Sequence, residues 1–102
     1  MQKDIQFSIP IIVQTMATRG LELHRQYGRG GTNVGLSTAR RLSKGESVDY
    51  KFVRKVSQYF PRHEGDNLNE KDPPSNGWIA WLLWGGWEGW RWSKRIVEQV
   101  ER

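Results

Sequence analysis

Apolar residues recur at helical spacing in the first quarter of the chain. Ser8, Ile9 and Pro10 together are typical of a helix start, because serine caps free amides and proline is tolerated in the first turn. Gaps of three or four residues then separate positions that line one helical face. We therefore expect a helix over residues 8–26, whose inner face is formed by Ile9, Ile12, Val13, Met16, Gly20, Leu23 and Tyr27.

Two more helices are predicted in the middle of the chain. Residues 33–43 place Val34, Ala39 and Leu42 on one side and end before Gly45, a residue type favoured at a left-handed C-cap. Ser47 is the expected N-cap of a helix over residues 47–60, which should end before Pro61. The two faces of this third helix are an apolar one with Val48, Phe52, Val56, Tyr59 and Phe60 and a polar one with Lys51, Arg54, Lys55, Gln58 and Arg62.

The last part of the chain is predicted to form a polar loop followed by two helices. Residues 61–75 contain a Pro pair and an acidic run and are predicted to form a loop. Gly85 and Gly86 divide an apolar helix, residues 76–84, from an amphipathic helix, residues 87–101, whose inner face carries Ile96, Val97 and Val100. We expect a single all-α domain over residues 1–102: a compact bundle of four to five short helices, with a polar loop before a Trp-rich C-terminal helical pair.

Six tryptophans lie between residues 78 and 92, and five of them follow one another at a spacing of three. On one unbroken helix, this spacing rotates each ring by about 60° from the previous one, so the rings cannot all face one core. Each buried ring is worth about 4–6 kcal/mol, because it removes roughly 150–250 Å² from water. Rings left at the surface would form an apolar contact site for another molecule, unless they are partly covered.

The amino-acid composition limits the cellular compartment, the metal sites and the membrane contacts that can be expected. The chain has no cysteine, so it has neither disulfides nor a thiolate metal site, and a reducing cytoplasm is expected. The apolar run WIAWLLW has seven residues, whereas a membrane span needs about twenty. We therefore expect no integral membrane contact. Interfacial contact through tryptophans beside Arg91, Lys94 and Arg95 stays open, although Glu88, Glu98 and Glu101 weaken that interpretation.

Positive charge is concentrated in the middle of the chain. Residues 19–62 hold ten basic and three acidic residues, whereas residues 63–76 carry a net charge of −3. The basic segment is a candidate surface for a polyanion, or simply a solvated face. Helices at 33–43 and 47–60, joined by a tight turn, are compatible with a helix-turn-helix, in which the second helix enters the major groove of DNA. The candidate nucleic-acid-binding residues are Arg29, Arg40, Arg41, Lys44, Lys51, Arg54, Lys55 and Arg62.

Two short motifs contain groups that could bind phosphate or transfer protons. The run from Gly28 to Thr32 resembles a phosphate cradle only superficially, because it lacks the Gly-Lys-Ser/Thr that opens a helix after a strand; a glycine helix stop is favoured. Arg62, His63 and Glu64 combine groups capable of acid–base work, but three adjacent residues do not make a site, and a capping or charge-paired His63 is favoured. We expect no catalytic residue, no metal ligand and no cofactor.

Three segments together resemble a small domain encoded by tailed phages, including cyanophages. They are GLELHRQYGRGGTNVGLSTARRL, VRKVSQYFPRHEGDN, and SNGWIAWLLWGG followed by Trp92, and the resemblance covers about Arg19 to Val97. Domains of that family occur free-standing and attached to or near head-maturation proteins. The resemblance implies a non-enzymatic phage protein, a virion-assembly or morphogenesis accessory located in the host cytoplasm or the virion. A DNA-binding protein that uses the basic helix is the alternative.

The same resemblance divides the tryptophans into two groups. Trp81, Trp84 and Trp92 match the family pattern and are the core candidates. Trp78, Trp87 and Trp90 are additions to that pattern, so they are the candidate protein-interface residues. Their expected partner is a phage structural protein or a second copy of the chain.

Overall fold

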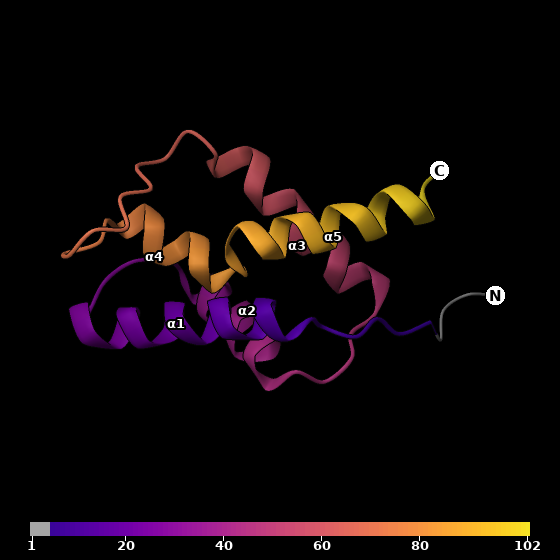
Figure 1. Ribbon diagram of the computed structural model, residues 1–102, viewed down its shortest axis with the longest axis horizontal. Coiled ribbons are helices and arrows are strands. Elements are labelled where there is room, and N and C mark those ends of the chain that lie inside the picture. Colours follow the sequence, from indigo (N-terminus) through magenta and orange to yellow (C-terminus); the bar gives the residue numbers. More distant parts are fainter. Residues whose placement is uncertain (1–4) are drawn as a thin grey trace.

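The computed structural model describes residues 5–102 and contains five helices (Figure 1). They are α1 (Ile11–Tyr27), α2 (Asn33–Lys44), α3 (Tyr50–His63), α4 (Asn76–Leu83) and α5 (Gly86–Val100). Helix α1 packs against α2, α4 and α5, and α3 packs against α5. This arrangement confirms the predicted all-α bundle with a polar loop before a Trp-rich helical pair. Residues 1–4 of the expected domain lie outside the described residues.

An extended pairing between distant segments sets where two helices begin. The Phe7 N–H donates to the Val48 carbonyl at 2.8 Å, and the Val48 N–H donates to the Phe7 carbonyl at 2.9 Å. Because Val48 is paired and buried, α3 begins only at Tyr50, and Asp49 rather than Ser47 is its N-cap. The expected N-cap at Ser8 is also wrong, since α1 begins at Ile11 after Pro10.

The end of α3 differs from the prediction as well. The helix continues through Pro61 to His63 instead of ending at Phe60. Proline has no N–H, so position 61 cannot donate the hydrogen bond to the Ser57 carbonyl, but only one turn of helix follows this break. The fully buried Phe60 and the His63 ring, stacked on Tyr59 at 4.3 Å, hold the last turn in place.

Side chains from all five helices meet in one interior. Three residues expected there lie instead at the surface: Ile12 is 45% exposed, Val34 52% and Val100 51%. All three belong to the first or last turn of a helix. The side chains at the centre of the core include Val13, Ala17, Ala39, Leu42, Val53, Val56, Phe60, Trp81, Leu83 and Trp92.

A break between α4 and α5 lets tryptophans from both helices reach the same core. Gly85 and Gly86 adopt positive φ values of 107° and 65°, which glycine tolerates without steric cost. Trp81 from α4 and Trp90 from α5 therefore both pack on Phe60, with ring centroids 4.9 and 5.5 Å away. Trp81, Trp84 and Trp92 are buried, which confirms them as core residues.

Glycines also let α4 approach the first part of the chain closely. A Cβ on Gly20 would lie 2.7 Å from the backbone nitrogen of Leu83, and one on Gly30 would lie 2.7 Å from the Cβ of Ile79. Gly28 ends α1 in the left-handed conformation, and its N–H donates to the His24 carbonyl at 2.8 Å. The glycine-rich run from Gly28 to Gly31 thus ends α1 and leaves room for α4 to pack closely against it.

Candidate nucleic-acid interface

The charged side of α3 faces solvent along the length of the helix. Lys51, Arg54, Lys55, Gln58 and Arg62 are all exposed, whereas the apolar side of the helix lies in the core. A rise of about 1.5 Å per residue places the first and last of these side chains about 16 Å apart along the helix axis. The division into two faces, predicted from the spacing, is confirmed.

The C-terminal half of α2 extends this charged surface. Arg40, Arg41 and Lys44 are exposed, and the Arg41 guanidinium lies 4.5 Å from the centre of the Phe52 ring at the start of α3. Arg41 thereby bridges the two helices through a cation–π contact. We call the seven cations on these two helices the basic face: Arg40, Arg41, Lys44, Lys51, Arg54, Lys55 and Arg62.

Three shallow hollows follow one another along the basic face. One of about 540 Å³ lies beside Arg40, Arg41 and Lys44 at the end of α2. Arg41 also lines the next hollow, of about 600 Å³, together with Lys51 and Arg54. Lys55 lines that hollow and a third, of about 540 Å³, which Arg62 closes at the far end. The cations therefore form one continuous surface.

Few carboxylates neutralise this surface. The Arg54 Nε lies 3.4 Å from the Glu101 carboxylate, which also accepts a hydrogen bond from the Tyr50 hydroxyl. Burial and this hydrogen bond to Glu101 raise the pKa of Tyr50. Asp49 accepts from the Phe52 N–H at 3.0 Å and so serves as the helix cap. Among residues 5–102, the other six cations of the basic face have no carboxylate oxygen within 4 Å.

Arg29 lies apart from the other predicted cations. Its Nη1 donates to the Asn76 Oδ1 at 2.7 Å, at the start of α4, and its guanidinium lies 5.4 Å from the Tyr27 ring centre. The loop between α1 and α2 thus ties Arg29 to α4. Sequence position grouped Arg29 with the other cations, but the structure holds it in the loop before α2, against Asn76, rather than on α2 or α3.

The helix-turn-helix interpretation is wrong. Both α2 and α3 lie within the described residues, but their backbones do not pack side by side, and the Arg41 side chain reaches across to Phe52. Helix α2 packs on α1 and α4, while α3 packs on α5 and, less extensively, on α4. A helix-turn-helix needs its two helices in mutual contact, so that the first supports the second in the groove. The basic face is therefore a surface over two separately anchored helices.

The C-terminal part of α3 carries a stack of three rings. Tyr59 lies between Trp84, at 4.6 Å and 7° between ring planes, and His63, at 4.3 Å and 17°. The Nδ1 of His63 lies 2.9 Å from a carboxylate oxygen of Asp66, so its partner is Asp66 rather than the adjacent Glu64. The Tyr59 hydroxyl is buried without a hydrogen-bond partner, and burial followed by the charge of Asp66 raises its pKa.

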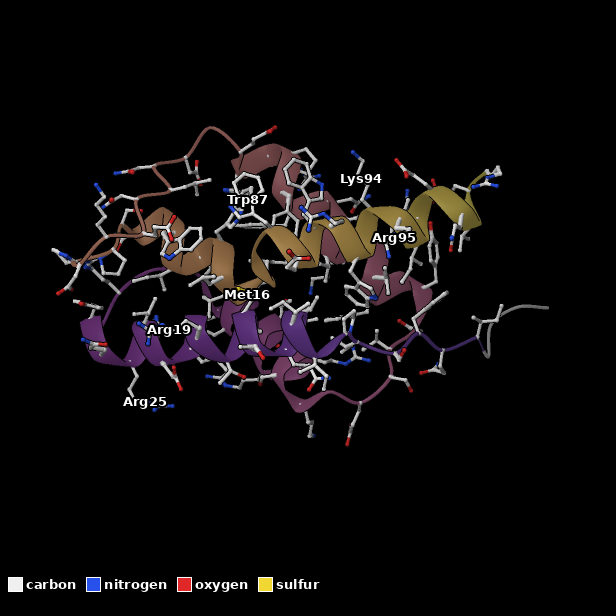
Figure 2. All side chains as sticks on the ribbon, viewed as in Figure 1. Met16, Arg19, Arg25, Trp87, Lys94 and Arg95 are labelled. Atoms are coloured by element: carbon white, nitrogen blue, oxygen red, sulfur yellow. The ribbon has the colours of Figure 1, made fainter. Side chains whose placement is uncertain are left out.

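The three candidate interface tryptophans differ in exposure. Trp87 is 47% exposed near the start of α5 (Figure 2) and contacts Trp81 edge to face at 4.9 Å. Trp90 and Trp78 are partly buried and pack against the core. The surface available for a protein contact is thus mainly the Trp87 ring, and not all three rings.

The remaining chemistry is sparse in the described residues. The Nδ1 of His24 lies 2.9 Å from the Gly30 carbonyl. Within residues 5–102, no group of three histidine or acidic side chains lies close enough together to hold a metal ion. None of the helices within that range has both the length and the apolarity needed to cross a membrane.

Searches against models of protein families, curated proteins and solved structures found no match.

Proposed function

We propose that this chain is a non-enzymatic binding protein whose basic face contacts the phosphate backbone of DNA. The observation that carries the proposal is the continuous surface of seven cations, six of which have no carboxylate partner within residues 5–102. Lysine and arginine bind phosphates while releasing the counterions condensed on DNA. The charged side of α3 spans about 16 Å, which corresponds to roughly five base pairs of rise.

The proposed contacts are made to phosphates rather than to bases. Because α2 and α3 do not pack as a helix-turn-helix, the support that this motif gives to a helix in the major groove is missing. Flexible lysine and arginine side chains on an exposed helix can still follow a phosphate backbone, and such contacts carry no sequence information. We therefore propose binding with little sequence preference.

A comparison of two charge-matched double variants tests the proposal. Lys44→Gln with Lys51→Gln removes two charges from the basic face, and neither lysine makes an ion pair within residues 5–102. Lys94→Gln with Arg95→Gln removes two charges from the exposed side of α5 (Figure 2). Both residues are exposed, and neither lines one of the three hollows of the basic face.

The measurement is fluorescence anisotropy with a labelled 20-base-pair duplex at several salt concentrations. We expect wild-type affinity to fall steeply with salt, and the slope to decrease by about two for the first double variant, because each phosphate contact contributes roughly 0.9. The α5 variant should keep a slope close to that of the wild type. Binding independent of salt, or equal affinity losses in both variants, would contradict the proposal.

A second candidate function is a virion-assembly accessory that binds a phage structural protein through Trp87. The observation that favours it is a large aromatic ring, 47% exposed, held against Trp81 and Trp90. Partly exposed tryptophans of this kind often provide much of the binding energy in protein interfaces. Mass spectrometry of purified particles should then detect the wild-type chain and lose it with Trp87→Ala. A strictly monomeric chain that is absent from particles would speak against this role.

A further inference from the structure

We propose that the groove between α2, α3 and α4 binds a nucleoside phosphate, either free or as the unpaired end of a nucleic-acid strand. This groove is the third hollow of the basic face, about 540 Å³, and its walls include Val34, Lys55, Arg62, His63 and Asn76. Only the strand-end form rests on the proposed DNA contact. The volume lies within the range of about 300–1,000 Å³ that is usual for small-molecule sites.

The charges of the groove favour an anionic group. Lys55 and Arg62 lie two helical turns apart on the same side of α3, and neither has a carboxylate oxygen within 4 Å among residues 5–102. The Lys55 ammonium lies 6.0 Å from the centre of the Trp84 ring, over the aromatic floor of the groove. Asp66 is the one carboxylate in the lining, and it is paired with His63. A phosphate near Lys55 and Arg62 would meet two cations with no competing anion in contact with them.

The ring stack favours a planar partner for that phosphate. Both faces of Tyr59 are covered, one by Trp84 and the other by His63. His63 is therefore the outermost ring, and its side chain is 42% exposed. A nucleobase placed on the free face of His63 would add a fourth layer to the stack. Base–aromatic stacking of this kind typically changes affinity by about tenfold or more.

Amide groups complete the polar lining. Gln58 and Asn76 both line the groove. The Oδ1 of Asn76 already accepts a hydrogen bond from Arg29 at 2.7 Å, which orients the side chain and leaves its amide N–H groups available as donors. Arg29, separate from the basic face, thereby acts as a positioning residue at the rim of this groove. Side-chain amides of this type can donate to ring nitrogens, carbonyl oxygens or phosphate oxygens.

The direct test is a titration of the ¹⁵N-labelled protein followed through the indole N–H signals of its tryptophans. The probes are adenosine 5′-monophosphate, adenosine, inorganic phosphate and a 5′-phosphorylated oligothymidylate. We expect adenosine 5′-monophosphate to shift the Trp84 signal and leave the Trp87 signal in place, with adenosine and phosphate at least tenfold weaker. Binding of the oligothymidylate but not of the mononucleotide would assign the groove to strand ends, and the reverse to free nucleotides. No Trp84 shift with either nucleotide probe would overturn the proposal.

Variants separate this groove from the rest of the basic face. His63→Ala should weaken the binding of adenosine 5′-monophosphate by about tenfold, whereas His63→Phe, which keeps a ring in the stack, should retain it. Arg62→Gln should weaken it also, and Lys51→Gln, outside the groove, should leave it unchanged. An unshifted Trp81 signal shows that each variant is folded. Equal nucleotide binding by His63→Ala, Arg62→Gln and the wild type would overturn the groove proposal even if duplex DNA still bound through Lys51, whereas salt-independent duplex binding would overturn only the proposed function.

Discussion

At the scale of single residues, Gly20 determines how closely α1 and α4 approach. The position is buried, and a methyl group there would meet the backbone of Leu82 and Leu83 at 2.9 and 2.7 Å. Alanine is favoured over glycine in a helix interior by about 1 kcal/mol. Overpacking costs about 1–3 kcal/mol, and a backbone cannot move aside as a flexible side chain can. The steric cost should therefore outweigh the gain in helix propensity.

We expect Gly20→Ala to lower the free energy of unfolding by about 1–2 kcal/mol, which urea denaturation would measure. Gly65→Ala is the matched control, because nothing lies within 4 Å of its added Cβ and its φ is not positive. That control should be neutral or slightly stabilising. A Gly20→Ala protein as stable as the wild type would show that α4 shifts to accommodate the methyl group.

The buried hydroxyl of Tyr59 lowers the stability of the folded protein. Its hydroxyl is buried without a hydrogen-bond partner, and leaving a polar group unsatisfied costs roughly 1–3 kcal/mol. Burial raises the pKa of Tyr59 above its ordinary value of 10.0, so the folded state holds this proton more tightly than the unfolded state. The corresponding stability is fully present below pH 10 and is lost as the pH rises further.

Tyr59→Phe should therefore raise the free energy of unfolding at pH 7 by about 1 kcal/mol, since the stacked ring remains and the unsatisfied hydroxyl is removed. It should also make the loss of stability above pH 10 less steep. Urea denaturation at pH 7 and at pH 10.5 measures both effects. A destabilised variant, or one that loses stability with pH as steeply as the wild type, would mean that water or another group solvates the hydroxyl.

At the scale of elements, local spacing predicted the helices, their faces and the first residues of α2 and α4, but not where α1 and α3 begin. The amphipathic pattern of α3 depends on neighbours within one helix, so it can be read from the chain. The start of α3 depends on the pairing of Val48 with Phe7, 41 positions earlier, which no local pattern contains. With Val48 held extended, Ser47 cannot cap the helix, and Asp49 takes its place.

The cap at Asp49 gives a prediction that separates stability from binding. Asp49→Ala should lower the free energy of unfolding by about 1 kcal/mol, because it removes the acceptor for the Phe52 N–H. For a domain of this size the corresponding change in Tm is about 4–8 °C. Asp49→Asn keeps a good cap while it removes a negative charge beside Lys51 and Arg54.

Thermal melts and duplex anisotropy together test these two changes. Asp49→Asn should melt within a few degrees of the wild type and bind DNA more tightly at low salt, while Asp49→Ala should melt clearly lower. If both variants melted at the wild-type temperature, the hydrogen bond at the start of α3 would not contribute to stability.

At the scale of the whole molecule, chain order explains which parts of the candidate sites could be predicted. The seven cations of the basic face lie on two consecutive helices, so charge counting along the sequence finds them together. Arg29 also lies in this segment, but the loop after α1 ties it to Asn76 at the start of α4. The groove around His63 forms only when α2, α3 and α4 are in their final positions, so it could not be predicted from the sequence. The contact between His63 and Asp66 could not be predicted either, because no sequence motif marks it.

Glu101 links the far end of the chain to the basic face, and its removal tests whether charge location matters beyond net charge. Its carboxylate holds Arg54 at 3.4 Å and accepts from the Tyr50 hydroxyl. Glu101→Gln should free Arg54 for phosphate and raise duplex affinity by about two- to fivefold at low salt. Stability should change by less than about 1 kcal/mol, because both partners of this ion pair are half exposed.

Glu98→Gln is the matched control, because Glu98 is exposed in the last turn of α5, three residues before Glu101, and makes no ion pair within residues 5–102. Both variants gain one unit of net charge, so long-range attraction to DNA increases equally in the two. Any additional affinity of Glu101→Gln must come from the release of Arg54. Anisotropy titrations at low and high salt should show this difference at low salt and its disappearance as screening increases. Equal affinities of the two variants at every salt concentration would mean that DNA responds to total charge, and that the position of Arg54 on α3 is irrelevant to binding.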